Sequence, residues 1–212
     1  MKIEYKKSPV TFGVIAICVV MYLYTTYKFG GVMTAFEALQ VGALHPIWVI
    51  ERHQYYRLFT ANILHYGFMH MFLNCYSLYT IGAMMGLEQS LKTKRYLFII
   101  VVSMLFTTGV PCLLYGIFSI GSNSVMAGLS GVVFGLIGAM SALALYYRGQ
   151  YLQVFKQIYQ SVIAMLIISV LVPSISLVGH VAGMLGGFIA VFIIIKWNKI
   201  FRREPKEETL IH

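Results

Sequence analysis

Long apolar stretches, separated by short polar segments, run along the whole 212-residue chain. Four of them, at 8–27, 58–87, 96–147 and 157–195, contain no Lys, Arg, Asp or Glu. A helix that crosses the hydrocarbon core of a bilayer needs about 20 mainly apolar residues. The first stretch therefore predicts one membrane-spanning helix, and each of the other three is longer than a single span requires.

Turn-forming residues divide the longer stretches. The segment up to about Gly67 is interpreted as a loop at the membrane edge, Gly, Ser and Asn cluster at 116–123, and Pro173-Ser174 interrupts the last stretch. We therefore expect an all-α polytopic membrane protein, a single membrane domain over 1–212 that forms a six-helix bundle. The expected spans lie near 9–27, 66–87, 96–115, 127–147, 157–172 and 177–196.

Two segments fall outside these spans. Residues 28–65 are too polar to cross a membrane but contain Trp and several Tyr, which favour the membrane interface, so we expect a structured outer loop there. Residues 197–212 are strongly charged and are expected to form a cytoplasmic, partly disordered tail.

Composition and charge support this interpretation. The chain is 59% hydrophobic and 11% charged, which excludes an ordinary soluble domain. Its net charge of +9 could suggest a nucleic-acid partner, but the basic residues sit in short runs between apolar stretches. Thirteen of the 16 Lys and Arg fall on the side that holds both termini in a six-span topology. The positive-inside rule then predicts cytoplasmic termini, a cell-membrane location with the lipid bilayer as partner, and no nucleic acid.

A few polar side chains fall in the apolar stretches, where they are energetically expensive and are candidates for function. Ser130 lies on the fourth expected span and His180 on the sixth. His70 and Asn74 lie one turn apart on the second, and His65 precedes them. Because these three spans all start on the outer side, we expect the polar groups at a common level, with Ser130 about two turns below the outer surface.

Glycines surround these groups. Gly128 and Gly131 flank the serine, which leaves its hydroxyl accessible, and Gly131 and Gly135 form a small-residue ridge on the fourth span. The sixth span carries a second ridge beside its histidine. Two such ridges allow helices to approach closely, which would bring the imidazole within hydrogen-bond reach of the serine. The second ridge consists of Gly179, Gly183 and Gly187.

Each of these residues also has a structural interpretation. Alone, Ser130 could bond back to a carbonyl of its own helix, His180 could be a satisfied interhelical histidine, and His70 with Asn74 could be a polar contact between helices. Their common depth and ordered spacing favour a joint chemical role.

In this set the sequence resembles the rhomboid intramembrane serine proteases, in their bacterial six-helix form. The matching pieces are Arg57, the run His65-xxxx-His70-xxx-Asn74, Gly128-Leu129-Ser130-Gly131, and Gly179-His180-xx-Gly183. Two positions depart from the expected bacterial pattern. Tyr56 precedes Arg57 where Trp is expected, and Phe134 stands where a Tyr is often found.

The resemblance implies a serine–histidine dyad without cofactor or metal. Ser130 would be the nucleophile and His180 the general base. His70, Asn74 and the backbone N–H of Ser130 would form the oxyanion hole. Supporting roles would fall to residues near the pair: Gly128 and Leu129 along the substrate-facing loop, Gly131 in the motif, His65 as a brace, Phe134 stacking on the imidazole, and Arg57 holding the outer loop through backbone carbonyls.

The expected function is therefore an intramembrane serine endopeptidase that cleaves transmembrane protein substrates near the outer membrane face. The alternatives are a catalytically inactive rhomboid-like protein that binds membrane clients, and a small transporter. The sequence contains no His-Glu-xx-His zinc motif, and the absence of Asp excludes an aspartyl dyad or a Ser-His-Asp triad. Substrate identity and oligomeric state do not follow from the sequence.

Overall fold

The computed structural model describes residues 7–147, 149–171 and 176–201. These residues are mainly helical, with two isolated β-bridges and no longer strand among them. The break expected at Pro173-Ser174 and most of the expected tail lie outside the described residues.

Within the part of the chain that the structure describes, five helices are long and apolar enough to cross a membrane. This confirms the prediction of an all-α, multi-pass membrane protein. The five are α1 (Pro9–Phe29), α7 (Thr93–Phe118), α8 (Ser130–Tyr147), α9 (Gly149–Leu171) and α10 (Leu177–Phe201).

The segment expected to form the second span is built differently from the others. Helix α5 (Phe68–Tyr79) is only 12 residues long, and it continues into a π-helical segment, η3 (Thr80–Met84). Gly86, in the left-handed conformation, then starts the short helix α6 (Leu87–Leu91). Wider π-helical turns are rare and usually local insertions, so the apolar pattern alone did not reveal this change.

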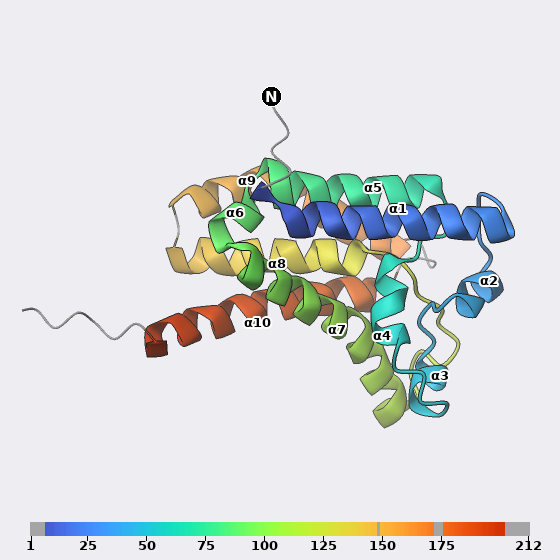
Figure 1. The fold of residues 1–212 in the computed structure, drawn as a ribbon. Helices are drawn as coiled ribbons and strands as arrows, with labels where there is room; N and C mark the ends of the chain where they lie inside the picture. Colours follow the sequence, from blue (N-terminus) through green and yellow to red (C-terminus); the bar gives the residue numbers. More distant parts are fainter. Residues whose placement is uncertain (1–6, 148, 172–175, 202–212) are drawn as a thin grey trace, which may run out of the picture.

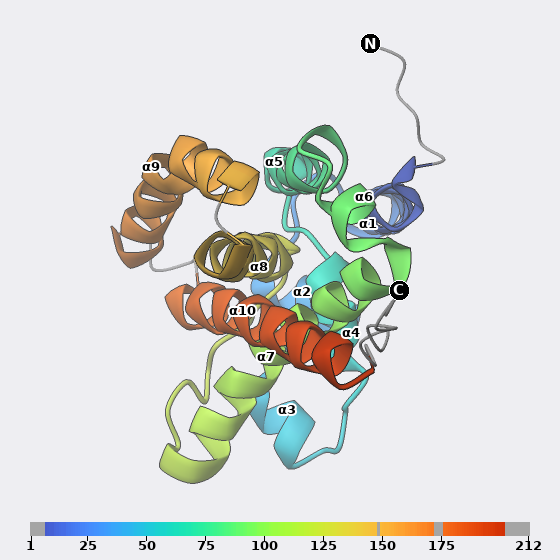
Figure 2. The same cartoon turned by 90° about the vertical axis from the view of Figure 1, so that its left-hand side faces the viewer.

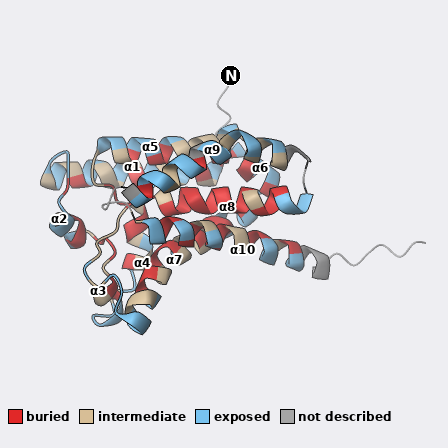
Figure 3. Cartoon of the chain, turned by 180° about the vertical axis from the view of Figure 1, so that it is seen from behind, coloured by how far each residue is buried: buried red, intermediate tan, exposed pale blue. Residues whose placement is uncertain are grey.

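Helix α8 forms the centre of the bundle. Figures 1 and 2 show α5, α7, α9 and α10 arranged around it, and α8 packs most extensively against α10. Its residues from Gly131 to Met140 are all buried, as the continuous red of α8 shows in Figure 3. An apolar helix buried on every side is expected at the core of a membrane bundle rather than at its lipid-facing edge.

The two glycine ridges meet backbone to backbone, as the spacing predicts. A Cβ placed on Gly183 would lie 2.1 Å from the Gly131 carbonyl oxygen, and one on Gly187 would lie 1.8 Å from the Gly135 carbonyl oxygen. Gly179 does not take part, since its nearest neighbour is the Met126 side chain. Without a hydrophobic driving force between helices in lipid, this close contact is what holds α8 against α10. We call the contact the α8–α10 seam.

The outer loop contains three short helices and a 3-10 turn, and it lies at one end of the bundle (Figure 1). They are α2 (Ala35–Gln40), α3 (Pro46–Ile50), α4 (Arg57–Thr60) and η2 (Ala61–Ile63).

Arg57 holds this outer loop together. Its side chain is 3% exposed, and its Nη1 donates hydrogen bonds to the carbonyls of Leu39 (2.9 Å) and Ala43 (2.6 Å). Its guanidinium also lies 4.6 Å from the ring centroid of Trp48. Burial lowers the pKa of the Arg57 guanidinium from its ordinary value, but arginine stays charged in any accessible pH range. The expected role of Arg57 in holding the loop through backbone carbonyls is confirmed.

The opposite end of the bundle is tied by a buried carboxylate. Glu88, in the short charged segment between the apolar stretches 58–87 and 96–147, is 0% exposed. It accepts hydrogen bonds from the backbone N–H of Val10 (2.9 Å), and from the N–H (2.9 Å) and hydroxyl (2.8 Å) of Thr11. The first N–H groups of a helix have no partner within it, and a carboxylate at this position also complements the helix dipole. Glu88 therefore fastens the start of α1 to α6.

Candidate active site

The serine and the histidine singled out by the sequence lie within hydrogen-bond distance of one another. His180 Nε2 is 2.8 Å from Ser130 Oγ. Ser130 is the first residue of α8, three residues later than the start expected for that span, and His180 lies in the first turn of α10. The α8–α10 seam begins one residue after Ser130, so the close approach of the two helices sets this distance.

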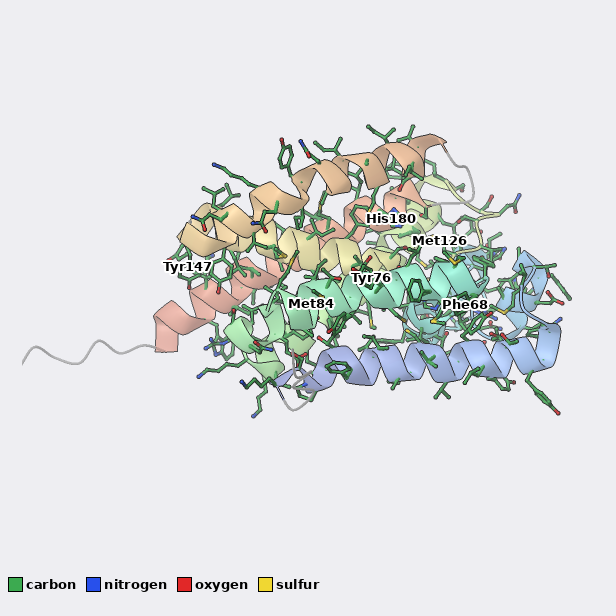
Figure 4. The ribbon with its side chains drawn as sticks, turned by 90° about the horizontal axis from the view of Figure 1, so that it is seen from above. Phe68, Tyr76, Met84, Met126, Tyr147 and His180 are labelled. Carbon is green, nitrogen blue, oxygen red and sulfur yellow. The ribbon has the colours of Figure 1, made fainter. Side chains whose placement is uncertain are left out.

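The site lies toward the end of the bundle that carries the outer loop. Figure 4 shows His180 at the same end as Phe68 and Met126, and away from Met84 and Tyr147. Helices α5, α8 and α10 all begin at this end, so their polar residues lie at a similar level along the bundle, as the spacing predicts.

The imidazole of His180 is held on two further sides. The ring of Phe134, one turn after Ser130, stacks on it with centroids 4.4 Å apart and an interplanar angle of 20°. The hydroxyl of Ser169, on α9, lies 2.8 Å from His180 Nδ1. His180 is 7% exposed and Ser169 is 4% exposed, so both ring nitrogens face protein hydroxyl groups within the bundle.

Residues 128–129, directly before Ser130, form an ordered, non-helical segment, which we call the strap. Gly128 has a φ of +134°, a region that residues with a side chain rarely adopt. Its N–H donates to the carbonyl of Ala61 (2.9 Å), and the N–H of Leu129 donates to His65 Nε2 (3.4 Å). A Cβ on Gly128 would also lie 2.8 Å from the His70 ring. These contacts keep residues 128–129 out of the helix and fix where α8 starts.

His70 and Asn74 line the other side of this strap. The ring of His70 packs at 6.2 Å against Tyr66 and at 5.1 Å against His65. The amide of Asn74 is 7% exposed and donates to the His70 carbonyl at 2.8 Å. An amide group has two hydrogens, so one remains for another acceptor.

Two polar contacts of the bundle, those of Ser169 and Glu88, were not expected from the sequence. The inward face of α9 carries Val162, Met165, Leu166 and Ser169 at helical spacing, which is the pattern that could have pointed to Ser169. No local pattern points to Glu88, because its partners lie more than 70 residues away. Among the described residues, no group of three or more His, Cys, Asp or Glu is placed to hold a metal ion.

The fold and the site together define a polytopic helical membrane protein with a serine–histidine pair inside its bundle. Residues 52–197 match the family model described as the rhomboid domain. This match covers more than half of the chain, and the chain belongs to the rhomboid family.

Curated relatives agree with this assignment. The chain is 26% identical over 190 residues to "Rhomboid protease GluP" of Bacillus subtilis, covering 88% of this chain and 35% of that protein. It is 30% identical over 160 residues to "RHOMBOID-like protein 1" of Arabidopsis thaliana, covering 74% and 39%. It is 24% identical over 189 residues to "Rhomboid-like protein 15" of the same plant, covering 84% and 45%. The chain thus spans less than half the length of each of these three relatives.

Proposed function

We propose that this chain is an intramembrane serine endopeptidase that cuts transmembrane protein substrates near the outer face of the cell membrane. The observation that carries the proposal is the 2.8 Å contact between Ser130 Oγ and His180 Nε2 inside a membrane bundle. A nucleophile within hydrogen-bond reach of a base is the common signature of covalent catalysis by serine.

In the proposed reaction, His180 Nε2 removes the proton from Ser130 Oγ as the oxygen attacks the scissile carbonyl. The resulting imidazolium then gives that proton to the leaving amine, and the C–N bond breaks. Water repeats the sequence on the acyl-enzyme with His180 again acting as base, which releases the carboxylate product and restores the serine. The stacked ring of Phe134 keeps the imidazole in one plane during these transfers.

The oxyanion of the tetrahedral intermediate would be stabilised from two sides. The N–H of Ser130 opens α8, where helix N–H groups lack partners and the helix dipole is positive. The side chains of His70 and Asn74, from α5, would donate from the other side. The left-handed backbone of Gly128 supports this assignment, because it lets the His70 ring approach the strap closely.

The position of the site supports a substrate that reaches it from the membrane. The candidate site lies toward the loop end of the bundle, and the positive-inside rule, applied to the Lys and Arg of the sequence, favours an outer position for that end and cytoplasmic termini. A transmembrane segment would present its outer end to Ser130 at this level. The alternative of an inactive, client-binding relative requires that the serine and the histidine fail to act, although both are present and in contact.

Cleavage of a single-span model substrate in detergent tests the proposal. We expect Ser130→Ala and His180→Ala each to lower cleavage by at least about a thousandfold, since removing one member of such a unit costs about as much as removing both. Both variants should keep the wild-type melting temperature within a few degrees. Cleavage near the wild-type rate in either variant would exclude this dyad.

A further inference from the structure

A serine hydroxyl on α9 occupies the position next to the candidate base that a carboxylate holds in a catalytic triad. The chain contains no Asp, and the described contacts of the His180 ring nitrogens are Ser130 Oγ and Ser169 Oγ. We infer that Ser169 is a positioning residue, which holds His180 in the tautomer that can accept the proton of Ser130. This inference rests on the proposed protease function and extends it to a third helix.

The hydrogen-bond geometry determines which tautomer Ser169 favours. Its Oγ also lies 2.8 Å from the carbonyl oxygen of Met165, one turn earlier on α9, and donates to it. A hydroxyl has a single hydrogen, so once this hydrogen points to Met165, Ser169 can only accept from His180 Nδ1. Nδ1 must then carry the proton, and Nε2 presents its lone pair to Ser130. The result is a directed chain from Ser130 through His180 and Ser169 to the Met165 carbonyl.

The same arrangement suits the charged intermediate. When His180 takes the second proton, Nδ1 keeps its own, and Ser169 continues to accept from it without reorienting. The Met165 carbonyl polarises the hydroxyl in the favourable direction, because linked hydrogen bonds strengthen one another in a low-dielectric interior. One fixed geometry therefore serves both the neutral and the protonated ring.

Burial makes the contact important. Ser169 and His180 are 4% and 7% exposed, so water has little access to replace the lost acceptor. Without the hydroxyl, a buried Nδ1–H has no partner, and burying a polar group unpaired is costly. The ring can then reduce the cost by taking the other tautomer, with the hydrogen on Nε2. In that state His180 cannot accept the proton of Ser130.

The placement of Ser169 on α9 has a structural consequence. Among the candidate spans, α9 is the least buried. In its apolar 18-residue stretch 12% is buried within the bundle, against 72% in that of α8. Since the group that orients the base sits on the least buried span, an outward displacement of α9 would remove the acceptor from His180. Reactivity of the dyad is thus tied to the docked position of α9.

The test uses four variants of the full chain in detergent, measured for kcat and KM on a single-span substrate. Ser169→Ala removes the hydroxyl, Ser169→Cys keeps the volume with a weak acceptor, and Ser169→Thr keeps the hydroxyl. Ser141→Ala is the matched control. Ser141 Oγ also bonds a carbonyl one turn back (Ile137, 2.9 Å), and Ser141 also faces α9, but it lies far along α8 from His180.

We expect kcat to fall about ten- to hundredfold in the Ala and Cys variants, the value of one hydrogen bond to a charged group, with KM changed less than about twofold. The Thr variant and Ser141→Ala should stay within about threefold of wild type. An unchanged kcat in Ser169→Ala or, if that variant does not fold, in Ser169→Cys overturns the inference. So does an equal loss in Ser169→Thr or in Ser141→Ala. A wild-type chain that does not cleave would instead refute the proposed protease activity, whatever the Ser169 variants do.

Discussion

Helices α10 and α9 both contact the central helix α8, but they do so in opposite ways. At the α8–α10 seam the backbones touch, with glycine facing glycine at two successive turns. Helix α9 contacts α8 less closely. An apolar groove remains beside α9, lined by residues such as Leu152, Phe155, Val162 and Leu166. In the apolar 18-residue stretch of α10, 50% is buried within the bundle, whereas only 12% is buried in the corresponding stretch of α9.

The difference separates two tasks that the candidate site requires. The seam sets the distance between Ser130 and His180, because it allows the backbones of α8 and α10 to approach directly next to the site. Helix α9 supplies Ser169, which fixes the orientation of the ring, and it is the more easily displaced of the two neighbours. Distance is therefore set by rigid packing, and orientation depends on a helix that is held weakly.

The largest effect should come from breaking the seam. In Gly187→Ala the new Cβ would lie 1.8 Å from the Gly135 carbonyl oxygen, so α8 and α10 must separate by more than an ångström. We expect loss of detectable cleavage and a melting temperature lower by about 10 °C or more. This shift corresponds to a loss on the order of several kcal/mol in the free energy of unfolding. The matched control is Gly109→Ala on α7, whose Cβ would meet nothing within 4 Å.

The control should be as stable as the wild type or slightly more stable, since Ala is better than Gly in a helix by about 1 kcal/mol. If both alanine variants behave alike, the close backbone approach at Gly187 is not what holds the helices together.

Truncating one leucine on each helix should show the same contrast on a smaller scale. Leu136 on α8 is 0% exposed, whereas Leu166 on α9 is only partly buried. Leu136→Ala should lower the free energy of unfolding by about 3 kcal/mol because it leaves a cavity in a packed core. Leu166→Ala should cost about 1 kcal/mol, since a partly exposed site loses fewer contacts. Equilibrium unfolding in detergent measures both, and an equal cost would contradict the difference in packing.

The smallest effect on cleavage should come from the far end of the bundle. Glu88→Gln keeps the shape of the side chain but removes the negative charge. It also replaces one of the two oxygens that accept from the N–H groups of Val10 and Thr11. We expect a loss of about 1.5 kcal/mol in stability. The kcat of cleavage should stay within about twofold of wild type, because Glu88 ties α1 and not the helices of the site. A kcat reduced tenfold or more in a folded Glu88→Gln protein would show that α1 contributes to the site.

Much of this arrangement could be predicted from the sequence because it depends on spacing. Glycines four residues apart share one helix face, so the meeting of the ridges around Gly131 and Gly183 followed from the sequence. The uncharged stretches likewise predicted the helical membrane class. What spacing could not give is the exact start of α8. Contacts of Gly128 and Leu129 with Ala61 and His65, all distant in sequence, keep the strap out of the helix.

Long-range partners explain the other differences as well. Glu88 lies in a charged segment of the sequence, where a carboxylate normally faces water. Its carboxylate is buried because the start of α1 packs against it and donates two backbone N–H groups to it. Ser169 looked like one more hydroxyl in an apolar helix, and the rotation of α9 that points it at His180 is a property of the assembled bundle. The π-helical segment η3 has no signal in the apolar pattern.

Labelling with a fluorophosphonate probe tests the central claim most directly, because the probe reacts only with a serine that a neighbouring base has activated. The detergent-solubilised protein is incubated with the probe, digested, and mapped by mass spectrometry. We predict modification at Ser130, no modification in Ser130→Ala, and a rate lowered by at least about a hundredfold in His180→Ala. A modified residue other than Ser130, or labelling of His180→Ala at the wild-type rate, would contradict the account.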